Sequence, residues 1–293
     1  MKNFDYFIGI DWSGAKSPIR TKSIAVSIAE QGNKAPKLIS NLKSRQEVVD
    51  WIINLTKQKS RILIGIDCNF GYAATIAQKQ FGPDIKAHEL WSEVDLENKA
   101  NSNFFAGGFW QKYASDFWTE GKKPIGFKMP QRQTEAICSE NGYGHPESPF
   151  KLIGAKQVGK GGLAGMRVAH FLKEKLGPKI AIWPFEPHGN SAQIVMTEIY
   201  PRQFLMRAGF RTKKIRDINN LNNALFKLNS EPILLEYQIN DHQTDALVSA
   251  AGLRYLCGMN FEIPKNISAP HVMNDNAKNI EGWIFGVGDR RES

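Results

Sequence analysis

The tetrapeptide Ile-Gly-Ile-Asp occurs twice in this chain, at residues 8–11 and again at residues 64–67. Each copy closes a short apolar run, and short runs of β-branched and aromatic residues are typical of strands buried on both faces. The sequence therefore predicts two buried strands that end in the carboxylates of Asp11 and Asp67. If these strands are parallel neighbours, both carboxylates reach the carboxyl edge of one sheet, where open α/β sheets bind their ligands.

Two carboxylates at one sheet edge repel each other unless a cation lies between them. Carboxylate oxygens are also ligands that Mg²⁺ and Mn²⁺ favour. We therefore expect Asp11 and Asp67 to share a divalent metal ion, either Mg²⁺ or Mn²⁺.

The composition limits the class of protein. With 293 residues, 42% of them hydrophobic, the chain can bury a sizeable core, and we expect one domain over 1–293. Its three cysteines form no Cys-x-x-Cys pair, which argues against a disulfide framework and a structural zinc site. Asp5 and Asp11 interrupt the first apolar stretch and no run is long enough to span a membrane, so we expect a soluble, cytoplasmic protein without a membrane partner.

Basic residues exceed acidic ones, and 38 Lys and Arg against 29 Asp and Glu give a formal net charge of +9. Such an excess is compatible with a polyanionic partner such as DNA or RNA. Six basic residues gather in one short segment, at Arg202, Arg207, Arg211, Lys213, Lys214 and Arg216. Two interpretations of this segment remain open: a solvated surface, or a surface that contacts phosphate.

Hydrophobic periodicity predicts the order of the elements. The first series consists of strands at 6–10, 23–29 and 38–39, a helix at 45–56 and the strand at 62–66. A second series consists of a Gly-rich loop and helix over 159–176, strands at 180–183 and 194–199, helices from 202 and 217, a long helix over 241–257 and a short strand at 283–287.

Residues 84–150 differ from both series, because they are rich in aromatic side chains and have little clean periodicity. We interpret this segment as an insertion within the domain. Its aromatic residues are expected to form a small core of their own. The alternative is that they stack on unpaired bases.

The helix over 241–257 carries two further acids. Asp241 and Asp245 are four positions apart, which places them on one helical face, and Val248 and Gly252 continue that stripe. Asp245 lies on an otherwise apolar helix, where a charge usually has a partner or a metal. Asp241 follows Asn240 at the helix start, so it is either an accessory of the metal site or a helix cap.

Several short motifs, in their order along the chain, resemble one bacterial family. They are Gly-Ile-Asp-Trp-Ser-Gly-Ala at 9–15, the strand before Asp67, Glu-Ile-Tyr-Pro at 198–201, the helix from Asp241, and Glu-Gly-Trp-Ile-Phe-Gly-Val at 281–287. The family is domain of unknown function 429, described as predicted nucleases of ribonuclease H-like fold. The resemblance extends from about Tyr6 to Phe285.

The resemblance implies a mixed five-stranded sheet flanked by helices, with the first and fourth strands as neighbours. It also implies a two-metal nuclease site in which Asp245 joins Asp11 and Asp67, with Asp241 or His242 as an accessory. In such sites two cations roughly 4 Å apart activate water and stabilise the departing oxygen of a phosphodiester.

Glu198 ends the strand at 194–199 and is the best further candidate for a catalytic metal ligand. Its alternative role is a salt bridge to an arginine.

Residues 154–161 nearly match the phosphate-binding loop GxxxxGK[ST], but the final Ser or Thr, which binds magnesium, is absent. A true triphosphatase loop is therefore not expected. Lys156 and Lys160, on a Gly-rich loop before a helix, are candidates to hold a backbone phosphate. A plain flexible loop is the alternative.

These patterns predict a metal-dependent nuclease that acts on DNA or RNA. A first alternative is an actin-like ATP-binding phosphotransferase, because Ser13 and Gly14 after Asp11 resemble the first phosphate loop of that class. Those proteins duplicate the domain, whereas only one complete strand series is present here. A second alternative is a catalytically silent nucleic-acid binding module.

Overall fold

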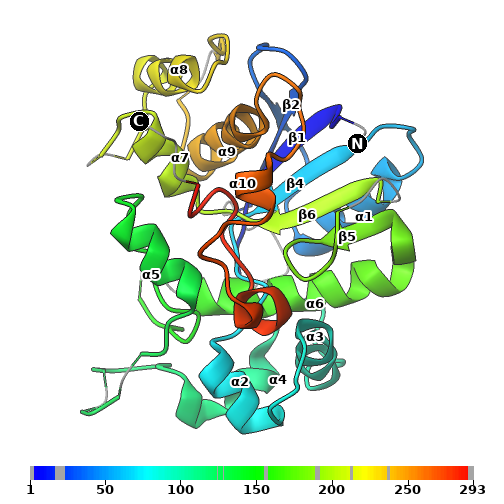
Figure 1. The fold of residues 1–293 in the computed structure, drawn as a ribbon, viewed down its shortest axis with the longest axis vertical. Helices are drawn as coiled ribbons and strands as arrows, with labels where there is room; N and C mark the ends of the chain where they lie inside the picture. Colours follow the sequence, from blue (N-terminus) through cyan, green and yellow to red (C-terminus); the bar gives the residue numbers. More distant parts are fainter. Residues whose placement is uncertain are drawn as a thin grey trace.

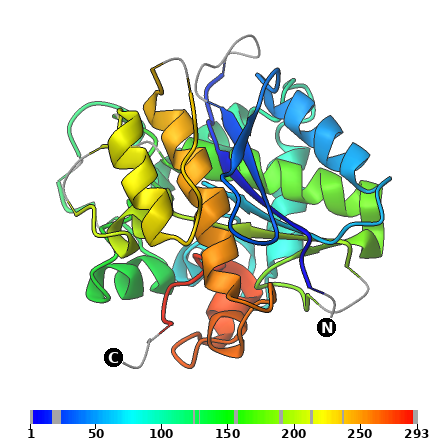
Figure 2. The same ribbon diagram turned by 90° about the horizontal axis from the view of Figure 1, so that it is seen from above.

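The computed structural model describes residues 3–16, 24–123, 125–127, 129–154, 158–188, 192–211, 214–235 and 238–289. A six-stranded mixed sheet lies at the centre, with helices on both faces (Figures 1 and 2). The α/β class is thus confirmed, but the expected count of five strands is wrong. The strands are β1 (Tyr6–Asp11), β2 (Ala25–Glu30), β3 (Lys37–Ile39), β4 (Ile62–Ile66), β5 (Ile180–Ile182) and β6 (Ile194–Glu198).

The strand order is β3-β2-β1-β4-β6-β5. β1 runs antiparallel to β2 and parallel to β4, while β4, β6 and β5 are all parallel. The two Ile-Gly-Ile-Asp segments are therefore neighbours, with Gly9 opposite Gly65 and Ile10 opposite Ile66. The sixth strand is β5, which extends the sheet beyond β6.

The helices cover the sheet in two layers. α9 packs over β1 and β2 on one face, whereas α6, with α1 beside it, covers the other (Figure 2). The helices are α1 (Arg45–Leu55), α2 (Ala74–Phe81), α3 (Ala87–Leu96), α4 (Gly107–Lys112), α5 (Gln133–Glu140), α6 (Val158–Leu176), α7 (Pro201–Arg207), α8 (Ile218–Lys227), α9 (Asp241–Cys257) and α10 (Lys265–Ser268). None of these described helices is long and apolar enough to cross a membrane.

The aromatic residues between β4 and α6 pack against one another. The rings of Tyr72 and Phe150 have centroids 4.6 Å apart, and those of Phe109 and Tyr113 are 4.8 Å apart. The expectation of a separate small core is wrong, because Phe109 and Phe150 belong to the same hydrophobic cluster as the isoleucines of β1 and β4. The three cysteines are free and buried in the core.

The expected strand at 283–287 does not form. Ile284 makes one isolated parallel bridge with Glu198, and the side chains of Trp283 and Phe285 are buried. Gly286 then turns the backbone with a φ of 86°, a conformation that an extended strand cannot adopt.

The expectation of a Gly-rich loop is also wrong where the structure describes these residues, because Gly159 and Lys160 already lie in the first turn of α6. Its glycines allow close packing. A Cβ atom at Gly162 would collide with the side chain of Asn69, and one at Gly165 with the Sγ atom of Cys68. These contacts hold α6 against the segment that follows β4.

Gly161 offers a matched control within the same helical turn, since a Cβ atom there would meet its nearest neighbour only at 3.8 Å. We predict that Gly162→Ala lowers the free energy of unfolding by about 1–3 kcal/mol through overpacking. Gly161→Ala should leave it unchanged or raise it by up to about 1 kcal/mol, because alanine favours helix. Urea unfolding measures both, and equal effects would contradict the packing role.

Candidate functional site

Asp11 and Asp67 leave neighbouring strands at the same edge of the sheet. Asp11 is the last residue of β1 and is only 6% exposed. Asp67 directly follows β4, and its backbone N–H donates a hydrogen bond of 2.9 Å to the carbonyl of Ile10. The predicted pairing of the two strands therefore brings the two carboxylates together at the carboxyl edge.

Asp245 reaches this edge from α9, which crosses directly over β1. Burial raises the pKa of Asp245 to about 7, and the negative charge of Asp11 adds to this effect. Burial also raises the pKa of Asp67 well above its usual value, and Asp11 and Asp245 both contribute. The three predicted carboxylates thus interact through their charges, and their mutual repulsion favours either a proton or a cation at this site.

His242 partly compensates this repulsion at Asp11. Its Nδ1 atom lies 2.6 Å from the Oδ2 atom of Asp11. The hydrogen bond raises the pKa of His242, so the protonated, positively charged form is favoured beside the carboxylate. The pKa of Asp11 is still raised, because burial outweighs the contribution of His242.

Asp241, at the first residue of α9, lies in an ion pair. Lys214 Nζ is 2.6 Å from one of its oxygens and Arg216 Nε is 2.7 Å from the other. Hydrogen bonding to Arg216 lowers the pKa of Asp241, with Lys214 contributing. The alternative of a helix cap is wrong for this residue, because the side chain of Asn240 caps α9 by accepting from the backbone N–H of Gln243.

Glu198 forms a salt bridge with an arginine, as its alternative role predicted. Its two oxygens accept hydrogen bonds of 2.6 and 2.8 Å from the guanidinium of Arg132. The same guanidinium also contacts Glu135 and the backbone carbonyl of Glu281, and all three charged side chains of Arg132, Glu135 and Glu198 are buried. The structure thus shows the alternative role of Glu198, the salt bridge to an arginine, and its role as a catalytic metal ligand stays a prediction.

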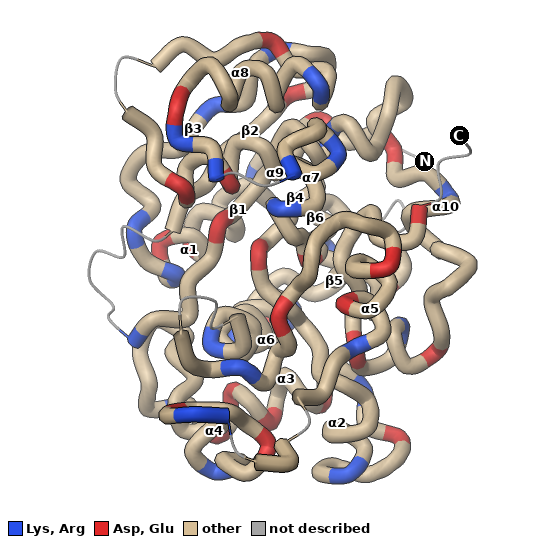
Figure 3. Tube along the Cα trace, turned by 90° about the vertical axis from the view of Figure 1, so that its left-hand side faces the viewer, with Lys and Arg blue, Asp and Glu red and all other residues tan. Residues whose placement is uncertain are grey.

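A cavity with a volume of about 800 Å³ opens beside the carboxylates. Its acidic residues are Asp67, Glu147, Asp241 and Asp245, whereas Arg202, Arg211 and Lys214 bring positive charge. Figure 3 shows that Lys and Arg are distributed over most of the chain, so net charge alone does not mark this place. The distinguishing feature is that acidic and basic side chains line one cavity at the carboxyl edge. The sequence indicated the basic segment but not that it faces the carboxylates.

Of the two lysines expected to hold phosphate, the structure describes only Lys160. Lys156 lies outside the described residues. Lys160 lies in the first turn of α6, with its Nζ atom 5.7 Å from the ring centroid of Trp110. That turn packs against the residues after β1, since the indole N–H of Trp12 donates a 3.2 Å hydrogen bond to the carbonyl of Gly161. Lys160 is therefore near the exit of β1.

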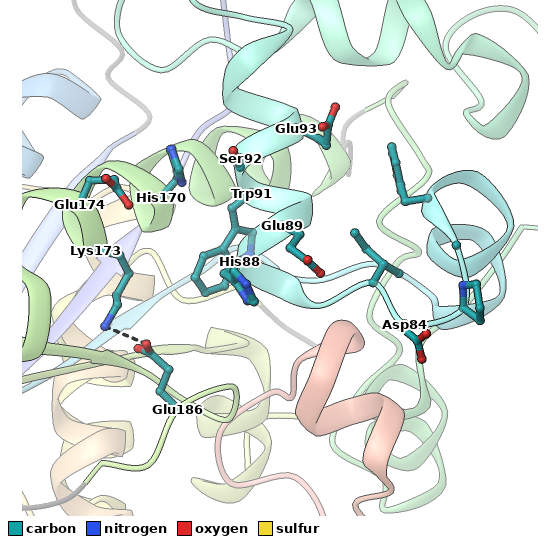
Figure 4. Close-up of a pocket in the computed structure, with 14 residues that line it drawn as sticks. Asp84, His88, Glu89, Trp91, Ser92, Glu93, His170, Lys173, Glu174 and Glu186 are labelled. Atoms are coloured by element: carbon teal, nitrogen blue, oxygen red, sulfur yellow. Dashed lines mark ion pairs between the residues drawn. The ribbon is translucent and has the colours of Figure 1, made fainter.

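A second cavity, of about 1030 Å³, lies between α3 and α6 (Figure 4). Its charged residues are mainly acidic, which disfavours phosphate: Asp84, Glu89, Glu93, Glu174 and Glu186 line it against Lys173. Two of these carboxylates have structural partners: Glu186 pairs with Lys173 at 2.7 Å, and Glu89 accepts from the backbone N–H of Lys86.

Across the described ranges, no group of three or more His, Cys, Asp or Glu side chains has the arrangement of a preformed metal site.

Comparisons of this chain with models of protein families, with curated proteins and with solved structures found no match.

The raised pKa of Asp245 predicts in which direction the stability of the fold changes with pH. The unfolded chain loses the Asp245 proton near pH 4 but the folded chain only near pH 7, so ionisation destabilises the fold progressively between these values. With EDTA present, Asp245→Asn should therefore gain stability over the wild type as the pH rises from 4 to 7, by about 2 kcal/mol at pH 8.

Asp241→Asn provides the control of opposite sign. The pKa of the wild-type Asp241 carboxyl is lowered in the folded state, so this carboxylate stabilises the fold above pH 4, and the stabilisation is lost as the pH falls. We expect Asp241→Asn to cost less than about 1 kcal/mol at pH 8, since its partners are exposed. Urea unfolding at pH 4, 6 and 8 separates the variants. An Asp245→Asn variant less stable than the wild type at pH 8 would contradict the claim that the ionised Asp245 carboxylate destabilises the fold.

Proposed function

We propose that this protein is a metal-dependent nuclease of ribonuclease H-like fold, related to the domain of unknown function 429 family, which hydrolyses phosphodiester bonds of DNA or RNA. One observation carries the proposal: Asp11 and Asp67 end adjacent parallel strands, and α9 brings Asp245 to the same edge. The β1-β4 adjacency and the antiparallel β2 and β3 are consistent with this fold, with β5 as an added edge strand.

The donor set fits a divalent cation. The pKa values of all three carboxylates are raised, chiefly by burial, and the charge of Asp11 adds to this at Asp67 and Asp245, so positive charge is favoured at the site. Hard oxygen donors suit Mg²⁺ or Mn²⁺. Asp11, Asp67 and Asp245 would hold the ions, with Asp241 as an accessory at the cavity wall. Bound ions of this kind supply an activated water and stabilise charge on the transferring phosphoryl group.

The remaining roles belong to basic side chains. Arg202, Arg211 and Lys214 line the cavity and can neutralise phosphate charge, which supplies salt-dependent affinity. Lys160, and Lys156 beyond the described residues, are assigned to flanking phosphates. His242 holds Asp11 in a fixed orientation through its 2.6 Å contact, so we assign it a positioning role.

We predict that Asp11→Asn abolishes Mg²⁺- or Mn²⁺-dependent cleavage while nucleic-acid binding stays within about threefold of wild type or tightens. The carboxylate acts only by holding cations, and its removal deletes a negative charge that faces phosphate. Cleavage of labelled single-stranded, duplex and branched substrates, with binding measured in Ca²⁺, tests both halves.

Asp84→Asn is the matched control, because Asp84 is an exposed aspartate in the acidic second cavity. It should cleave at the wild-type rate. Equal cleavage by wild type and Asp11→Asn would place the activity elsewhere, and binding without cleavage by either would favour the silent binding module.

A further inference from the structure

The cavity beside the carboxylates is small compared with a duplex. Its volume is about 800 Å³, within the range of pockets that enclose most of a single small ligand. Residues from well-separated segments form its walls, including Gly144 after α5, Tyr200 and Met206 around α7, and Ile215 before α8. One nucleotide fits this space, whereas a base-paired helix does not.

The lining matches the parts of a nucleotide. Leu205, Met206 and Ile215 give an apolar surface, and the aromatic ring of Tyr200 lies at the same cavity. Apolar and aromatic side chains hold unpaired bases by stacking, with little preference for sequence. Arg202 and Arg211 provide positive charge for phosphate, and the carboxylates of Asp67 and Asp245 line the same cavity.

We propose that this cavity binds one unpaired nucleotide, so that the substrates are single strands and not duplexes. The base lies against Leu205 and Met206, and its phosphate faces Arg202 and Arg211. The cleavage of such a strand rests on the proposed nuclease function, but the binding of the nucleotide does not.

Binding is tested first, with thymidine 5′-monophosphate and adenosine 5′-monophosphate as probes in isothermal titration calorimetry with Ca²⁺. Met206→Trp fills the cavity and should lower the affinity for both probes at least tenfold. Met259→Trp makes the same change at a 91% exposed position beyond the far end of α9 and should bind like wild type. Arg211→Gln, at an exposed position, should also lower the affinity for both probes. It replaces Met206→Trp as the test if that variant does not fold. Equal affinity in the cavity variants and wild type would overturn the proposal.

Cleavage is tested next, with a linear single strand and the blunt duplex of the same sequence in Mn²⁺. The single strand should be cut at least tenfold faster, and Met206→Trp should lose that activity while Met259→Trp keeps it. A duplex cut as fast as the single strand overturns the single-strand assignment but leaves the nuclease function standing. Nucleotide binding that depends on Met206 without any cleavage supports the cavity assignment and overturns the nuclease function.

Discussion

The contact between α9 and Gly9 of β1 determines how the rest of the site is built. A Cβ atom at Gly9 would lie 2.5 Å from the carbonyl oxygen of Ala246 and 2.6 Å from the backbone nitrogen of Ala250. The helix backbone therefore rests directly on the strand, which only glycine permits. Because Asp245 precedes Ala246, this close approach also brings its carboxylate to the edge where Asp11 and Asp67 end.

Charge is distributed around this edge in a specific way. Arg132 neutralises Glu198, Lys214 and Arg216 neutralise Asp241, and His242 pairs with Asp11. Asp67 and Asp245 have no ion pair of this kind among the described residues, and their pKa values are raised. A pair of partly buried acids without a cation is costly for stability, and such sites are typical of functional centres.

The sequence was most informative where local pattern and tertiary packing coincide. The two Ile-Gly-Ile-Asp copies predicted two buried strands because both runs suit a fully buried position, and the family resemblance implied that these strands are neighbours, as the structure shows. The helix over 241–257 was predicted with the bounds that the structure has. A salt bridge of Glu198 to an arginine was an expected alternative, but its partner Arg132 was not predictable, because Arg132 lies 66 positions away and no local pattern connects the two. Likewise, the glycines after Val158 suggested a loop, whereas Gly162 and Gly165 serve the close approach of α6 to Asn69 and Cys68.

The position of Mn²⁺ in a crystal soaked with a manganese salt, located by anomalous scattering, tests the central claim most directly. We predict a peak bound by oxygens of both Asp11 and Asp67, at roughly 2.0–2.6 Å, with Asp245 in or beside its coordination shell. Strong peaks confined to the acidic cavity of Asp84 and Glu89, with none between Asp11 and Asp67, would contradict it.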